Sequence, residues 1–463
     1  MFQSKLCILL HIVLVFILIT LTKGCPDVNT KGKTIEKDWW ETSSFYQIYP
    51  RSFKDSNGDG IGDLKGIKSK LQHLKDIGVN ATWLSPIYKS PMVDFGYDIS
   101  DFYEINPDYG TMKDFEELIE EAKKLGIKII LDFVPNHSSD ENIWFQKSIK
   151  RIEPYTDYYV WHKGKPNPDG GRPLPPSNWL QAFRGSAWEW NEERQEYYLH
   201  QFDIKQPDLN YRNPVVVEQM KHVLRYWLNK GVAGFRVDAV PWCFEVAPKN
   251  GEYPDEPPSG FTQDKEEAAY LSHIYTQDQP ETVDMVFQWR QLLDDYQRIH
   301  GGDTRVLMIE TYSSLDNVMK FYGTRSIKGA QMPFNFQFIL QGNKDSSAKD
   351  ITNIIKSWFN NMPGAYTPNW VMGNHDQRRV ASRYGVDKID TMNMILMILP
   401  GAAITYNGDE IGMIDGDIKF EDSKDPAAIR AGPEKYQKFT RDPARTPMQW
   451  DDSTSAGVKD PIL

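Results

Sequence analysis

The chain has 463 residues, of which 40% are hydrophobic and 25% are charged. Its 14 Trp, 23 Tyr and 22 Phe exclude an intrinsically disordered protein, and its length suits one large α/β barrel with insertions. The formal net charge of −11 argues against nucleic acid as a partner, because an acidic surface repels polyanions.

The N-terminal segment has the pattern of a secretory signal peptide. Lys5 precedes an apolar stretch from Leu6 to Leu21, and a small residue follows this stretch closely. We therefore expect residues 1–24 to be a signal peptide and the protein to be secreted. An uncleaved anchor at a cell surface is the alternative, since the stretch is near the lower limit for a bilayer span. Only Cys25 and Cys243 follow, so a disulfide framework is not expected.

Short apolar, β-rich runs then alternate with helical patterns, which is the order of βα units around a parallel sheet. Apolar residues recur at helical spacing in Met112–Leu125 and Val215–Asn229, each followed by a glycine that favours a helix end. The candidate strands are Phe45–Tyr49, Thr82–Ser85, Lys128–Val134, Gly234–Val240, Val306–Ile309, Gln331–Phe336, Asn369–Met372 and Ala402–Tyr406. Eight such strands predict an α/β protein with a closed (β/α)8 barrel.

One interval interrupts this alternation. Residues 138–205 are rich in Trp, Tyr, Pro and Gly, and they are too many for a βα loop. We expect a small domain inserted after the third strand. The catalytic barrel would then comprise residues 25–137 and 206–463.

Charged side chains follow several of these strands, at the end where barrels build active sites. Strand alternation places Arg236 and Asp238 on the same side, where the guanidinium would keep the carboxylate ionised, as a nucleophile requires. A structural ion pair is the alternative. The strand ending at Ile309 leads into Glu310, and partial desolvation would raise its pKa to suit a general acid. A surface glutamate is the alternative there.

Two further strand ends carry polar groups. These are Asp132, Asn136 and His137 at the third strand, and Asn374, His375 and Asp376 at the seventh. Four polar strand ends on one rim predict an active site, because structural needs alone do not bring so many polar groups to one place.

Together these segments resemble the signature regions of the α-amylase family of glycoside hydrolases, family 13. The match joins Asp132–His137, Gly234–Asp238, Glu310 and Asn374–Asp376 in the family's order, and it covers nearly all of residues 39–450. Two further segments, Gln206–Asn210 and Arg441–Trp450, resemble the oligo-1,6-glucosidase and maltase branch of the family, which includes secreted insect-type maltases. This branch favours an exo-acting α-glucosidase over an endo-acting amylase.

The resemblance implies a role for each matching residue. Asp238 would be the nucleophile of a retaining mechanism, Glu310 the acid/base and Asp376 a third carboxylate that holds the sugar. The implied substrate-binding residues are Asp94, Tyr97, His137, Phe183, Phe202, Gln206, Arg236, His375 and Arg441. Aromatic residues among them could instead pack the inserted domain.

The segment from Asp55 to Asp63 places oxygen-bearing groups at every second residue, with glycines between them. Ca²⁺ prefers such ligands, although no glutamate follows at the twelfth position of an EF-hand. Resemblance to calcium loops of this family implies structural Ca²⁺ held by Asp55, Asn57, Asp59, the carbonyl of Ile61 and Asp63. A hydrogen-bonded turn without metal is the alternative. No organic cofactor is expected.

The expected reaction is hydrolysis of terminal, non-reducing α-1,4-linked glucose from maltose, short maltodextrins and sucrose. Small Ala239 follows the nucleophile, where 1,6-preferring relatives tend to carry valine, and this favours α-1,4 bonds. A non-catalytic relative, such as a transporter heavy chain or surface receptor, is one alternative, and a sucrose isomerase or transglucosidase is another. Family members usually continue into a C-terminal β-sandwich, which we expect to be absent or truncated here.

Overall fold

The computed structural model describes residues 37–364 and 366–452, and a compact unit begins at Trp39. The predicted signal segment, residues 1–24, lies outside the described residues. Within the described part of the chain, no helix is both long enough and apolar enough to cross a membrane.

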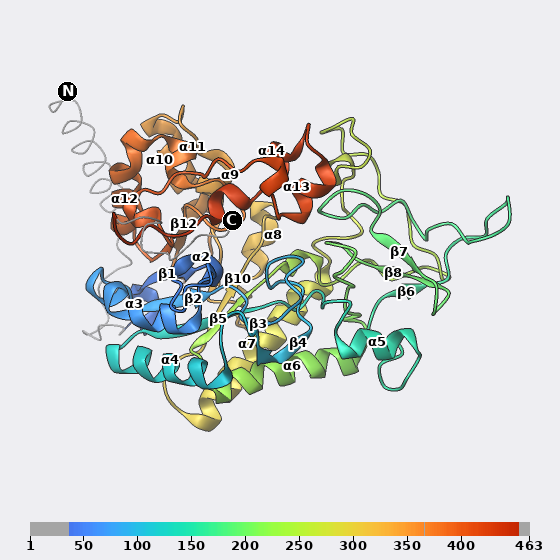
Figure 1. The fold of residues 1–463 in the computed structure, drawn as a ribbon, viewed down its shortest axis with the longest axis horizontal. Helices are drawn as coiled ribbons and strands as arrows, with labels where there is room; N and C mark the ends of the chain where they lie inside the picture. The colour runs from blue at the N-terminus through green and yellow to red at the C-terminus, as the bar shows by residue number, and fades with distance from the viewer. Residues whose placement is uncertain (1–36, 365, 453–463) are drawn as a thin grey trace. The chain divides into compact units, whose positions relative to one another are not determined.

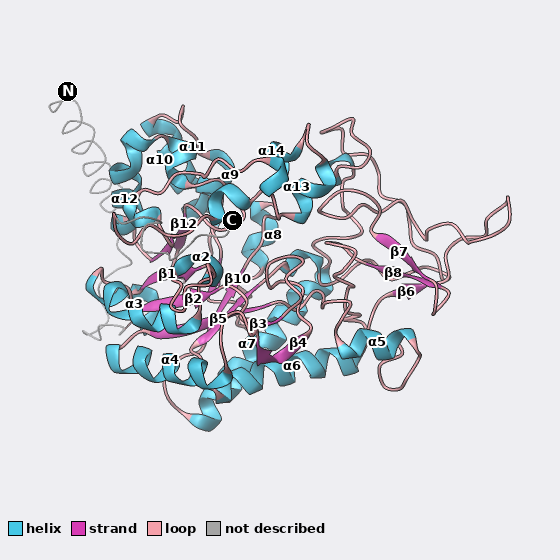
Figure 2. Ribbon diagram, viewed as in Figure 1, coloured by secondary structure: helices cyan, strands magenta, loops and turns pink. Residues whose placement is uncertain are grey.

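Eight parallel strands form one sheet that rolls into a nearly closed barrel, with helices around it (Figures 1 and 2). The strands are β1 (Ser44–Ile48), β2 (Ala81–Leu84), β5 (Lys128–Phe133), β9 (Gly234–Val237), β10 (Val306–Ile309), β11 (Met332–Pro333), β12 (Asn369–Val371) and β13 (Ala402–Tyr406). Their order in the sheet is β11-β10-β9-β5-β2-β1-β13-β12. The structure thus confirms the predicted barrel, and each of its strands lies on a predicted run.

Among the described residues, β11 and β12 form no strand ladder with each other. One side chain, that of Asn369, joins them instead. The backbone N–H of Asn335 donates to Oδ1 of Asn369 over 2.9 Å, and Nδ2 of Asn369 donates to the carbonyl of Pro333 over 2.7 Å. Asn369 is fully buried. Its amide therefore replaces the backbone hydrogen bonds that join the other strands.

Two strands are shorter than their sequences suggest. The run Gln331–Phe336 pairs only at Met332–Pro333, where proline has no N–H to give to a ladder. The run beginning at Gly234 ends at Val237, because Ala239 turns into the left-handed region with φ 47°.

The helices are α2 (Pro50–Phe53), α3 (Leu64–Asp76), α4 (Met112–Leu125), α5 (Ile143–Ile149), α6 (Pro214–Asn229), α7 (Pro280–His300), α8 (Leu315–Lys320), α9 (Gln337–Gln341), α10 (Ala348–Asn361), α11 (Val380–Tyr384), α12 (Ile389–Ile398), α13 (Pro426–Ala431) and α14 (Tyr436–Phe439). Helix α4 has the predicted bounds. Thr111 and Asp114 form a capping box at its start, and Gly126 ends it with φ 72°.

Between β5 and β9 the chain forms a separate antiparallel sheet of β6 (Trp161–His162), β7 (Trp188–Asn191) and β8 (Glu196–Leu199), in the order β6-β8-β7 (Figure 2). Trp179, Trp188 and Tyr253 pack together beside it, with ring centroids 4.9 to 5.6 Å apart. The inserted domain's boundaries at residues 138 and 205 stay a prediction. A short hairpin of β3 (Tyr88–Lys89) and β4 (Asp101–Ile105) precedes α4.

Strand alternation carries polar groups from the apolar barrel interior to the site. Ile130 and Met308 belong to the cluster of buried side chains inside the barrel, while their strand neighbours join the layer beneath the helices. Two residues further along the same faces stand Asp132 and Glu310, and Arg236 of β9 pairs in register with Asp132 on one side and with Met308 on the other. Three ionisable groups therefore enter the barrel at its carboxyl end.

Candidate active site

A cavity of about 470 Å³ opens at the carboxyl ends of the barrel strands. Its lining residues are Asp94, Tyr97, His137, Ala182, Phe183, Phe202, Asp238, Ala239, Pro241, Trp242, Gln277, Glu310, Thr311, Tyr312, Ser313, His375, Asp376, Gln377, Ala427, Lys438, Phe439 and Arg441. Ten of the twelve predicted catalytic and sugar-binding residues are among them. The other two, Gln206 and Arg236, are buried and bond to residues of the cavity wall.

One buried guanidinium serves three carboxylates at the base of the cavity. Nη1 of Arg236 lies 2.5 Å from Oδ1 of Asp238 and 3.0 Å from both oxygens of Asp132, and its Nη2 lies 3.8 Å from Oε2 of Glu310. The indole of Trp83 covers the guanidinium, 4.7 Å from the ring centre. A fixed cation among three carboxylates holds them close together without cancelling every negative charge.

This arrangement places Asp238 and Glu310 at unequal distances from one cation. Burial raises the pKa of both carboxyls, and the positive charge of Arg236 opposes that rise. Because Arg236 lies 1.3 Å closer to Asp238 than to Glu310, its charge stabilises the ionised form of Asp238 more than that of Glu310. Cleavage of a glycosidic bond requires one carboxylate and one carboxylic acid, and a pair with unequal contacts to one cation can supply them.

A strained backbone position holds the acid in place. Ala239, directly after Asp238, adopts φ 47° and ψ 34°, which costs about 1 kcal/mol or more for a residue with a Cβ. In this conformation its N–H donates to Oε2 of Glu310 over 2.8 Å. The turn that ends β9 thus links the two carboxyl groups through one residue.

A hydrogen-bonded chain fixes the tautomer of His375. Nε2 of Gln47 donates to Nδ1 of His375 over 2.8 Å, so the ring proton is on Nε2, 2.6 Å from the hydroxyl oxygen of Tyr97. The Tyr97 hydroxyl in turn donates to Asp132 over 3.0 Å, and its ring stacks on His375 with centroids 5.3 Å apart. Burial lowers the pKa of His375 well below its usual value and that of His137 to about 3, so both rings are neutral donors.

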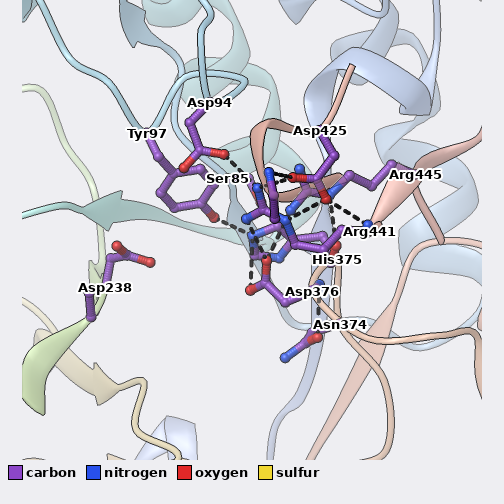
Figure 3. A network of polar contacts seen from close by, with 12 residues as sticks. Ser85, Asp94, Tyr97, Asp238, Asn374, His375, Asp376, Asp425, Arg441 and Arg445 are labelled. Carbon is purple, nitrogen blue, oxygen red and sulfur yellow. Dashed lines mark hydrogen bonds and ion pairs between the residues drawn. The ribbon is translucent and has the colours of Figure 1, made fainter. Parts of the chain in front are cut away.

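Asp376 lies among cations from the C-terminal part of the chain (Figure 3). Nη2 of Arg445 is 2.9 Å and Nη1 of Arg441 3.4 Å from its Oδ1. Burial alone would raise the pKa of Asp376. The positive charges of Arg445, Arg441 and Arg236 oppose burial and lower that pKa below its usual value. Asp376 is therefore an anion at neutral pH.

The far wall of the cavity is built around Asp94. Nη2 of Arg441 lies 2.8 Å and Nε2 of Gln206 3.2 Å from its carboxylate. The Arg441 guanidinium covers the ring of Phe183 at 4.8 Å, and Phe202 packs against Phe183 at 5.8 Å. These charged and aromatic groups form a wall with polar edges and apolar faces, which suits a sugar ring.

Sequence reasoning missed Asp425, a fully buried residue that positions Arg441. Its Oδ1 lies 2.8 Å from Nη2 of Arg441, and its Oδ2 lies 2.9 Å from Nε of the same side chain. Oδ1 also accepts the N–H of Ala427 at the start of α13. The Asp-Pro pair at residues 425–426 was a signal for a helix start, but nothing in the sequence showed that this cap would face Arg441.

The predicted calcium loop is closed by its own hydrogen bonds. Asp55 accepts the N–H groups of Asn57, Gly58 and Gly60, and Asp63 accepts from Ser56 and caps α3. Among residues 37–364 and 366–452, no three His, Cys, Asp or Glu side chains are grouped to hold a metal. All five predicted ligands, which include Asn57 and the carbonyl of Ile61, offer the oxygen atoms that Ca²⁺ prefers. Bound Ca²⁺ therefore stays a proposal.

The barrel and its buried carboxylates define a glycoside hydrolase. The model of the alpha amylase catalytic domain matches residues 47–461, and the chain belongs to the α-amylase family. It is 57% identical to Maltase A1 of Drosophila melanogaster over 91% of this chain and 74% of that protein. It is 56% identical to a salivary alpha-glucosidase of Anopheles gambiae over 91% of this chain and 71% of that protein.

A solved structure shares the same fold. The alpha-glucosyl transfer enzyme XgtA superimposes with a TM-score of 0.81 at 37% identity, over 92% of this chain and 77% of that one. The predicted family is thus confirmed from both sequence and structure.

Proposed function

We propose that this enzyme is a retaining, exo-acting α-glucosidase that releases terminal α-1,4-linked glucose from maltose, short maltodextrins and sucrose. That the chain is an α-glucosidase follows from its family and from relatives named maltase or alpha-glucosidase at 50–57% identity. Retention, the bond cleaved and the roles of single residues are the parts we propose.

In the first step, the carboxylate of Asp238 attacks the anomeric carbon of the terminal glucose. Glu310 gives its proton to the glycosidic oxygen, and the bond to the leaving sugar breaks. In the second step, Glu310 takes a proton from water, the water oxygen attacks the anomeric carbon, and the ester bond to Asp238 breaks. Asp376 and the neutral His375 would bond the glucose hydroxyls, more strongly as positive charge develops on the ring.

One observation carries this proposal above the others: a single guanidinium bridges the proposed nucleophile and acid at unequal distances. Arg236 lies 2.5 Å from Asp238 and 3.8 Å from Glu310, which favours the ionised form of the first over that of the second. A binding module without catalysis would have no need for two buried carboxyl groups with such unequal contacts to one cation.

The test is glucose release from maltose by the purified chain and by Asp238→Asn. We expect the variant to lose at least about a thousandfold in kcat, because a neutral amide cannot form the ester. Proton NMR of the first product should show α-glucose before it mutarotates. Release of β-glucose would exclude the double displacement. An inactive but folded wild-type chain would favour a non-catalytic role.

The preference for α-1,4 bonds rests on Ala239, which lines the cavity next to the nucleophile. Substitution by valine would narrow the leaving-group side and should shift the ratio of isomaltose to maltose hydrolysis upward. Cleavage of isomaltose much faster than maltose by the wild type would contradict the proposal.

We also propose structural Ca²⁺ in the loop 55–63 and secretion of the protein. The alternation of oxygen ligands supports the first, and relatives named salivary alpha-glucosidases support the second. Elemental analysis of purified protein tests the metal. Sequencing of the mature N-terminus from culture medium tests secretion, and an intact N-terminus on membranes would indicate an anchor instead.

A further inference from the structure

Part of the cavity wall comes from the segment 426–440, called here the rim segment, which contains α13 and α14. Ala427, Lys438 and Phe439 of this segment line the cavity beside the carboxylates. The rim segment lies beside the loop that precedes α7, shown in yellow-green next to the red helices (Figure 1). The contacts between the rim segment and that loop therefore set the position of this part of the cavity wall.

Asp264 in the loop before α7 joins three segments that are far apart in sequence. Its Oδ2 lies 2.9 Å from Nη2 of Arg184, which belongs to the predicted inserted domain, and 2.7 Å from Nζ of Lys435 in the rim segment. Hydrogen bonds from Lys435 and then from Arg184 lower the pKa of Asp264, so the carboxylate is an anion at neutral pH. One charge thus holds both walls of the cavity mouth.

Arg184 makes this junction more than an ordinary surface ion pair. Its backbone adopts a φ of 80°. Its side chain is 7% exposed, and the guanidinium covers the ring of Phe439 at 5.3 Å from the ring centre. Its Nε and Nη1 have no hydrogen-bond partner among the described residues. Among the described residues, the guanidinium forms an ion pair only with Asp264 and with Glu266, which lies 3.4 Å away and has a side chain that is 74% exposed. Loss of Asp264 would leave a buried charge almost unpaired.

Parallel contacts join the same segments. Nζ of Lys438 lies 2.6 Å from Glu267, and Nη2 of Arg430 lies 2.8 Å from Asp203. Lys438 is largely exposed, so its pair with Glu267 contributes little alone. Asp203 is buried, so Arg430 gives the rim segment a second attachment to the predicted inserted domain. Asp264 is the residue at which both walls meet.

We propose that Asp264 is a positioning residue for substrate length: it sets the outer wall of the cavity by holding the rim segment against Arg184. The inference rests on the proposed glucosidase function and adds its selectivity for short substrates. In the wild type, Phe439 and Lys438 line the cavity, and we place the second sugar of maltose beside them. Without Asp264 this wall moves outward, so maltose loses contacts while longer chains gain room.

The experiment compares Asp264→Asn with wild type on maltose and maltotetraose. We expect KM for maltose to rise about tenfold with kcat changed less than about threefold, since the reacting groups are untouched. The ratio of kcat/KM for maltotetraose to that for maltose should rise at least about threefold. Inhibition by glucose, which needs only the inner site, should stay within about twofold. Asp264→Glu, which keeps the charge, should restore most of the maltose KM.

Asp303→Asn is the matched control, because Asp303 also pairs with a lysine, Lys128, but at the amino end of β5. Hydrogen exchange of residues 426–440 gives a readout independent of activity and should be faster only in the Asp264 variant. If wild type fails to cleave maltose, the proposed function falls and exchange alone decides the positioning role. Unchanged exchange together with an unchanged ratio of substrates, or equal effects in the control, would overturn the inference.

Discussion

Substitution Asp425→Asn should weaken both stability and maltose binding, and the structure sets the size of the effect. The variant keeps the shape of the side chain but removes the charge that Arg441 contacts at 2.8 and 2.9 Å. Two charge-assisted hydrogen bonds are worth about 3–6 kcal/mol together, since each contributes roughly 1.5–3 kcal/mol. Arg441 keeps Asp94 at 2.8 Å and Asp376 at 3.4 Å, so we expect the lower end, about 3 kcal/mol of unfolding free energy.

The measurement is urea unfolding of wild type and variant at pH 7, read from the midpoint at unchanged slope. Asp295→Asn is the control: its partner Arg298 is exposed, and the loss should stay below about 0.5 kcal/mol. KM for maltose should rise in Asp425→Asn, because Arg441 loses one of its anchors and holds Asp94 and Phe183 less firmly in place. An unchanged midpoint at pH 7 would refute the argument that this carboxylate is needed.

The pH dependence gives a second check on Asp425. Burial would raise the pKa of this carboxyl, but Arg441 outweighs burial and lowers it below the usual value. A group with a lowered folded pKa stabilises the protein above its unfolded pKa, and this stability is lost as pH falls through the folded pKa. The gap between wild type and variant should therefore be constant near neutrality and narrow below about pH 4. A gap that stays constant to acid unfolding would contradict this.

Three other outcomes are expected. The kcat/KM for maltose should fall as pH rises, with an apparent pKa above the ordinary glutamate range, because Glu310 must be protonated and burial raises its pKa. A fall with the ordinary pKa of glutamate would argue against Glu310 as the acid. Asn369→Ala should lower the unfolding free energy by about 2–4 kcal/mol, since it leaves two buried backbone groups unpaired, and an unchanged urea midpoint would contradict this. If the loop 55–63 holds Ca²⁺, EGTA should lower the midpoint of thermal unfolding of the wild type but not that of Asp59→Ala. Equal wild-type midpoints with and without EGTA would contradict the proposal of bound Ca²⁺.

Strand existence was predictable, but strand length was not. Apolar β-rich runs located all eight barrel strands, and Ala402–Tyr406 and Val306–Ile309 match to the residue. The extent of pairing depends on neighbours that the sequence does not display. Pro333 cannot donate to a ladder, and the left-handed turn at Ala239 directs its N–H to the carboxylate of Glu310, which follows another strand.

The same distinction applies to the site. Residues at strand ends, such as Asp238 and Glu310, were predictable because the barrel brings every strand end to one rim. Asp425 and Asp264 were not, since both lie in loops whose positions follow from packing against distant segments. Their partners Arg441 and Arg184 lie 16 and 80 positions away in the chain. Such contacts leave no local pattern.

The seam between β11 and β12 has a consequence for how the enzyme moves. We expect a barrel that is closed at one place by a single side-chain amide to open there first when it is heated or strained. Asp238 and Glu310 follow β9 and β10, which share a full ladder, whereas Asp376 follows β12, beside the joint. Opening at the joint would carry the third carboxylate away and leave the reacting pair intact. We therefore expect sugar binding and the arrangement of the reacting pair to be lost at different temperatures.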